Sequence, residues 1–128
     1  MNPTALIIDD SRATRLMLGR ALRALGFEIL EADSAEAGLA VLDATAHLDI
    51  ALVDRNMPGV GGLGFVRGAR ARAQHRDLCL MMVSSETAPE RVMEAFEAGL
   101  DEYLMKPVTT EALQAKLQLL GFSWGDAP

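Results

Sequence analysis

The chain has 128 residues, and this length fits one domain that can bury a core without disulfides or metals. Half of the residues are hydrophobic and the formal charge at pH 7 is −6, which argues against a disordered chain and against non-specific binding to nucleic acids or anionic membranes. The single cysteine, Cys79, excludes an internal disulfide and a cysteine-based zinc site. The sequence shows no signal peptide and no apolar run near the ~20 residues of a membrane span, so we expect an acidic cytoplasmic protein.

Short apolar segments alternate with longer segments of helical periodicity along the whole chain. Strands are expected, in chain order, at residues 5–8, 27–32, 50–53, 79–83 and 103–105. Helices are expected, counted with their capping residues, at 11–25, 33–44, 62–73, 87–98 and 110–120. Two of these helices begin at a predicted capping box, in which Asp33 or Thr87 caps the helix and an acid follows three residues later.

The order of these elements predicts a doubly wound α/β fold. Three of the strands are continuously apolar, which is typical of a parallel sheet that helices cover on both faces. Ligands of such sheets bind beyond the carboxyl ends of the strands. The polar residues that follow the expected strands are Asp9, Asp10, Asp54, Ser84 and Lys106. We therefore expect these five side chains to meet at one edge of the sheet.

Carboxylates that converge in this way need a counter-charge. Two like charges about 4 Å apart repel by about 4 kcal/mol at an effective dielectric constant of about 20, so either one carboxyl is protonated or a cation lies between them. Oxygen ligands without histidine or cysteine favour a hard cation, and Mg²⁺ is the first candidate. Beside such an ion a carboxylate can attack phosphorus, while Lys106 neutralises the transferring oxygens and Ser84 donates a hydrogen bond to the new phosphoryl group.

Each of these residues taken alone also has a structural explanation. Asp9 and Asp10 are typical of helix caps, Asp54 is typical of a turn, and a lone serine or lysine at a strand end is more often structural than functional. The coincidence of all five at strand ends is what favours a functional site.

The segments LIIDDS, ALVDRNMPG, MVSSE and EYLMKP carry the five residues. At these separations they resemble the receiver domain of two-component response regulators, and in particular the stand-alone chemotaxis type. The resemblance covers residues 4–120. It implies a flavodoxin-like, five-stranded parallel sheet of order 2-1-3-4-5, with a receiver domain at 1–121. The tail at 122–128 is then too short for an output domain, and Trp124 within it is expected to pack against the last helix.

The resemblance also implies roles for the acidic residues. Asp54 resembles the phosphoacceptor, which takes a phosphoryl group from a phosphohistidine on a histidine kinase or a histidine phosphotransfer domain. Asp10 would bind Mg²⁺ directly, and Asp9 would support the ion. The backbone carbonyl of Asn56 would complete the protein ligands of the metal.

The remaining site residues resemble the family's switch. Lys106 would pair with the phosphoryl group, and its peptide bond to Pro107 would be cis. Ser84 would move to bond a phosphoryl oxygen, and Tyr103 would turn inward as it does so. This change would alter binding to a protein target, without direct contact to nucleic acid or membrane. Such a protein is a signalling phosphoacceptor that assists its own phosphorylation and dephosphorylation, and it is not a turnover enzyme.

A few positions depart from the family pattern. Gly61 stands where receivers often carry an aspartate at the cap of the third helix, Val108 replaces an aromatic residue, and Ser84 replaces the commoner threonine. Gly64 and Gly68 each cost the third helix up to ~1 kcal/mol relative to alanine, so we expect this segment to be mobile. We expect phosphorylation to be retained and its coupling to the switch to be looser.

The same residues bear on other functions. A receiver-like scaffold with weak or no phosphorylation-dependent switching fits the sequence, and so does a receiver excised from a larger hybrid kinase or regulator. An aspartyl-phosphate phosphatase requires a second acid where Asn56 stands, and Asp9 and Asp10 would repel the phosphate of a flavin. Four arginines form a local basic cluster, which is more typical of a solvated helix face and loop than of a site for an anion, a nucleotide second messenger or a partner; they are Arg67, Arg70, Arg72 and Arg76.

Overall fold

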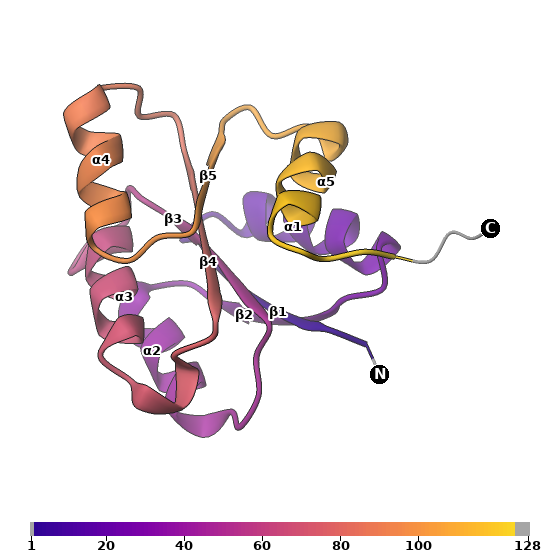
Figure 1. Ribbon diagram of the computed structural model, residues 1–128, viewed down its shortest axis with the longest axis horizontal. Coiled ribbons are helices and arrows are strands. Elements are labelled where there is room, and N and C mark those ends of the chain that lie inside the picture. The colour runs from indigo at the N-terminus through magenta and orange to yellow at the C-terminus, as the bar shows by residue number, and fades with distance from the viewer. Residues whose placement is uncertain (1, 125–128) are drawn as a thin grey trace.

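The computed structural model describes residues 2–124, in which five strands and five α-helices alternate along the chain (Figure 1). The strands are β1 (Thr4–Ile8), β2 (Glu28–Ala32), β3 (Ile50–Asp54), β4 (Cys79–Ser84) and β5 (Glu102–Met105). The α-helices are α1 (Arg12–Ala24), α2 (Ala35–Ala44), α3 (Gly61–Arg70), α4 (Pro89–Glu97) and α5 (Thr110–Leu119). Each strand and helix expected from the sequence is present, with ends that differ by a few residues.

All five strands belong to one parallel sheet of order β2-β1-β3-β4-β5, which confirms the predicted fold class. Helices α1 and α5 cover one face of this sheet, and α2, α3 and α4 cover the other (Figure 1). The chain runs outward from β1 to β2 and returns to β3, so the strand order reverses between β1 and β3. Because the strands are parallel, the carboxyl ends of β1, β3, β4 and β5 lie along one edge.

Alternate residues of the central strands pack into two hydrophobic cores. Leu6 and Ile8 of β1 belong to the core beneath α2, α3 and α4, whereas Ala5 and Ile7 belong to the core beneath α1 and α5. Every residue of β3 is buried, as a strand covered on both faces requires. Each fully buried leucine or isoleucine contributes about 1.5–3 kcal/mol to the stability of the fold. The packing of the helices on the sheet therefore stabilises the strands whose ends carry the polar residues.

The residues that begin α2 and α4 differ from the prediction. Ser34 and not Asp33 caps α2, and its Oγ accepts a hydrogen bond from an amide of the first turn at 3.0 Å. Ala88 occupies the N-cap of α4 without a side-chain cap bond, so the capping box predicted at Thr87 is wrong. The cause is Pro89, which restricts the residue before it to extended backbone and takes the first helical position.

The start of α3 packs directly on the end of β3. Gly61 has a φ of 68°, a left-handed conformation that favours glycine. A Cβ atom at Gly62 would lie 2.5 Å from the backbone oxygen of Asp54, so any side chain there would push the helix away from the strand. These two glycines therefore allow close packing beside the site. The mobility expected of α3 stays a prediction.

Two arginines of the basic cluster join α3 to neighbouring segments. Arg70 donates to three backbone carbonyls and pairs with Asp101 at 2.7 Å. Arg72 pairs with Asp43 of α2 at 2.6 Å and donates to a carbonyl near the end of α3, which stops at Arg70 and not at residue 73 as predicted. Arg70 and Arg72 are therefore partly exposed and paired within the protein, whereas Arg67 is exposed, as expected of a solvated face.

The chain after α5 returns to the core beneath α1 and α5. Phe122 and Trp124 pack against this core, and the ring of Phe122 lies 5.5 Å from that of Phe27. The expected packing of Trp124 is confirmed, while the last part of the predicted tail, 125–128, lies outside the described residues. Within residues 2–124 no helix has both the length and the apolar character that a membrane crossing requires.

Candidate functional site

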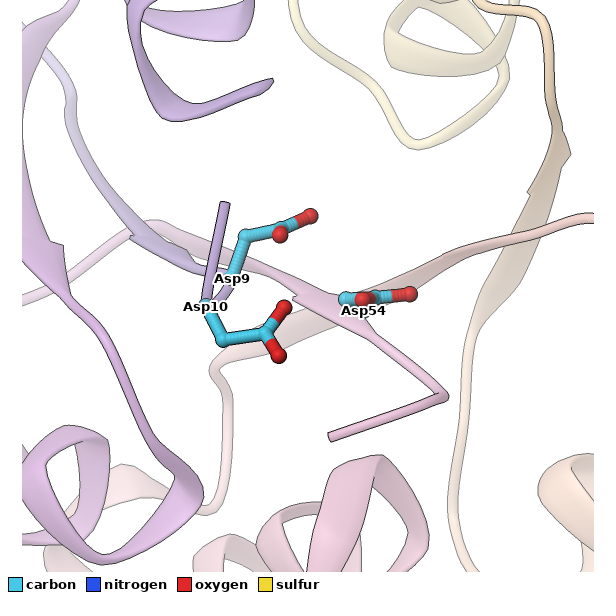
Figure 2. Close-up of side chains that lie close together, drawn as sticks. All are labelled: Asp9, Asp10 and Asp54. Carbon is cyan, nitrogen blue, oxygen red and sulfur yellow. The ribbon is translucent and has the colours of Figure 1, made fainter. Parts of the chain in front are cut away.

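Three carboxylates meet at the carboxyl edge of the sheet, where β1 and β3 end. Figure 2 shows Asp9 and Asp10, which directly follow β1, beside Asp54, the last residue of β3. One oxygen from each carboxylate lies within 4.8 Å of the other two. Asp9 and Asp54 are buried, whereas Asp10 is exposed to solvent. The structure thus brings together residues that the sequence separates by more than forty positions.

Asp9 has a buried carboxylate oxygen that no donor among the described residues reaches. Its Oδ1 accepts a hydrogen bond from the amide of Ser11 at 2.8 Å, but its Oδ2 is buried and has no partner among the described residues. Burial raises the pKa of Asp9, and the nearby charges of Asp54 and Asp10 raise it further. A buried oxygen without a donor and a cluster of like charges are what a hard divalent cation would relieve. The donor set therefore fits Mg²⁺.

Asp54 is held in place by a cation and by a backbone amide. Its Oδ1 accepts hydrogen bonds from Lys106 Nζ and from the amide of Asn56, each at 3.3 Å. Lys106 follows β5, and its own amide bonds to the carbonyl of Ser84 at 2.9 Å, which fixes its chain beside β4. The bond between Lys106 and Pro107 is cis. The metal role of the Asn56 carbonyl stays a prediction.

The two predicted switch residues are joined through a residue that sequence reasoning missed. Ser84 ends β4 and is fully buried, and its Oγ accepts a hydrogen bond from the amide of Glu86 at 3.0 Å. Tyr103 of β5 is also buried, and its hydroxyl donates to the carbonyl of Glu86 at 3.4 Å. The segment at Glu86 therefore contacts both side chains of the predicted switch at once.

Glu86 also organises the loop that leads into α4. Its Oε2 accepts from the amides of Thr87 and Ala88 at 3.1 Å each, and its Oε1 pairs with Arg91 at 2.8 Å. The hydrogen bond from Ala88 is the main reason that the pKa of Glu86 is lowered, and Arg91 adds to the effect. The only signal in the sequence that could have indicated Glu86 was its position two residues after Ser84, the polar end of β4.

A match to the model of the response regulator receiver domain covers residues 5–118, and the chain belongs to this family. Relatives agree with the assignment. The chain is 32% identical over 116 residues to the chemotaxis protein CheY1 of Helicobacter pylori, which spans 90% of this chain and 94% of that protein. It is 34% identical over 114 residues to the chemotaxis protein CheY of Pseudomonas aeruginosa, which spans 88% of this chain and 91% of that protein.

Solved structures show the same likeness. The structure of the chemotaxis response regulator CheY4 of Vibrio cholerae superimposes with a TM-score of 0.88 at 30% identity, and it covers 94% of this chain and 99% of that one. The chain is therefore a receiver domain of the CheY type, and receivers of this type are signalling proteins.

Proposed function

We propose that this chain is the phosphoacceptor of a two-component system and that Asp54 takes a phosphoryl group from a phosphohistidine. The observation that carries the proposal is the setting of Asp54. Its buried carboxylate contacts the Lys106 ammonium at 3.3 Å and shares a cluster with Asp9 and Asp10. The donor would be a histidine kinase or a histidine phosphotransfer domain, since the chain belongs to a family of receivers.

The transfer is a substitution at phosphorus. An oxygen of Asp54 forms a bond to phosphorus while the phosphorus–nitrogen bond breaks, and the leaving imidazole keeps that electron pair and takes up a proton. Among residues 2–124 both hydrogen bonds to the Asp54 carboxylate end on Oδ1, which leaves Oδ2 for the attack. Lys106 stays beside the carboxylate and neutralises charge on the transferring oxygens. The products are an acyl phosphate at Asp54 and a neutral histidine.

Asp9, Asp10 and Asp54 would hold Mg²⁺, with the backbone carbonyl of Asn56 as a further ligand. When bound, the ion supplies positive charge against the three carboxylates and the phosphoryl oxygens. The buried Oδ2 of Asp9, which lacks a partner among the described residues, supports this assignment because it needs a cation or a donor.

Ser84 and Tyr103 would turn phosphorylation into a change of shape. The hydroxyl of Ser84, which accepts from the amide of Glu86, would instead donate to a phosphoryl oxygen. Because Tyr103 bonds to the carbonyl of Glu86, a shift of this segment would move the tyrosine as well. The surface offered to a target protein would then change, with no direct role for nucleic acid or membrane.

The experiment is labelling by acetyl phosphate and Mg²⁺, read by intact-protein mass spectrometry. We expect the wild type to gain one phosphoryl group and Asp54→Asn to gain none. Asp33→Asn is the matched control, because Asp33 follows β2 at the same edge of the sheet but lies outside the cluster. Labelling that persists in Asp54→Asn would refute the assignment, and so would labelling that Asp33→Asn abolishes.

A further inference from the structure

Arg55 directly follows the proposed phosphoacceptor, and it is the one buried arginine among the described residues. Its side chain is only 4% exposed. A guanidinium withdrawn from water is costly unless its donors are satisfied and its charge is balanced. The side chain therefore depends on the partners that meet it inside the protein.

Both partners of this guanidinium belong to α4. Arg55 donates to the backbone oxygen of Arg91 at 2.7 Å and to Glu94 Oε1 at 3.0 Å. The carbonyl is in the first half of the helix, where the macrodipole is positive and disfavours a cation, so the carboxylate of Glu94 is needed to balance the charge. If α4 moves away from β3, Arg55 loses both contacts together.

The same helix is linked to the proposed switch. Arg91 pairs through its side chain with Glu86 at 2.8 Å, and the amide of Glu86 bonds to Ser84. The amide of Arg55 bonds to the carbonyl of Val83, next to Ser84 on β4, at 3.4 Å. Polar contacts therefore run from the residue after Asp54, across α4, and back to Ser84.

We propose that Arg55 is a positioning residue that ties α4 to the phosphoacceptor strand, so that a change at Asp54 reaches α4 through this guanidinium as well as through Ser84. The proposal rests on the proposed function, because the change at Asp54 is its phosphorylation. Arg55 does not touch the transferring group in this role. It sets where α4 lies against β3.

The test compares Arg55→Met with Arg67→Met. Methionine has a similar length and leaves no buried charge behind, because Glu94 is 48% exposed and stays hydrated. Arg67 is the matched control, since it approaches the same Glu94 at 4.0 Å but is 59% exposed. Glu94→Gln is a second variant that keeps an acceptor oxygen on the surface and removes the charge, so it tests the contact if Arg55→Met fails to fold.

Two measurements test whether Arg55 positions α4. The first is amide hydrogen exchange without ligand, where we expect α4 to exchange about tenfold faster in Arg55→Met, and α1 to be unchanged. The second is the shift of amide NMR signals on adding beryllofluoride and Mg²⁺. In Arg55→Met we expect the response of α4 to fall at least about twofold while Asp54 and Ser84 respond as in wild type. Arg67→Met should match wild type in both, and Glu94→Gln should lie between.

Equal α4 exchange in wild type and Arg55→Met would overturn the positioning role. An α4 response to beryllofluoride that is undiminished in Arg55→Met would overturn the transmission. If wild type itself showed no shift at Asp54 or Ser84, the proposed function would fail and the transmission with it. The positioning of α4 would then be judged by the exchange rates alone.

Discussion

The acid cluster makes Asp9→Asn an informative substitution, because it should stabilise the protein while weakening metal binding. Asp9 is buried, one of its oxygens lacks a partner among the described residues, and its charge lies beside two other carboxylates. Two unit charges 4.8 Å apart, the upper limit of the separation here, repel by about 3.5 kcal/mol at an effective dielectric constant of about 20. Lys106 and the solvent around Asp10 offset part of this repulsion. We therefore expect Asp9→Asn to raise the free energy of unfolding by about 1–2 kcal/mol.

Magnesium should reverse much of this gain. For a site with a Kd of about 1 mM, the linkage relation gives about 1.4 kcal/mol of added stability at about 10 mM Mg²⁺. Wild type should show this increase in urea unfolding, and Asp9→Asn should show little of it. Sodium chloride at matched ionic strength separates binding from screening, and Asp33→Asn should behave as wild type.

The difference in unfolding free energy between Asp9→Asn and wild type should depend on pH with a defined sign. The pKa of Asp9 is raised in the folded protein above its ordinary value of 3.8. At pH values above both the raised and the ordinary pKa, ionised Asp9 therefore lowers the stability of the fold. As the pH falls through the raised pKa toward 3.8, the folded wild type takes up the proton and the cost disappears. The advantage of Asp9→Asn should therefore shrink in acid. A variant that is less stable than wild type without Mg²⁺ at neutral pH would contradict the reasoning.

Further predictions concern α3 and the end of the chain. Amides of α3 should exchange faster with solvent than those of α1, and equal protection would show that its glycines do not loosen it. Gly62→Ala should destabilise the fold by about 2 kcal/mol or more and slow phosphorylation of Asp54, because its Cβ would lie 2.5 Å from the Asp54 carbonyl oxygen. Gly26→Ala, at a position where nothing lies near the new Cβ, should cost only about 1 kcal/mol. Urea titrations measure both changes. Fluorescence of Trp124, the single tryptophan, should shift to the red on unfolding, and an emission maximum already at that of free tryptophan in the native protein would refute its packing.

The fold class and the residues at the strand ends followed from the amino-acid sequence alone. Continuous apolar strands imply burial on both faces, and parallel strands place their carboxyl ends on one edge whatever the details of packing. This is why Asp9, Asp10 and Asp54 could be expected together before their positions were known. The same rule places Lys106 at this edge, but its contact with Asp54 across β4 was visible only in the structure.

Local boundaries were less predictable, because the chain offered two capping residues where one was used. Asp33 and Ser34 are both good caps, and in the structure the second of them caps α2. At α4 the restriction imposed by Pro89 overrode the capping box at Thr87.

Only the tertiary structure decided what Arg55 and Glu86 contact. The direction of a long side chain depends on which element packs beside it, and no pattern along the sequence records that α4 lies within reach of the residue after Asp54. Likewise, the lack of a partner for Asp9 Oδ2 among the described residues is visible only once the surrounding donors are placed in space. Periodicity and composition report how each segment is buried, whereas contacts between segments depend on geometry in three dimensions.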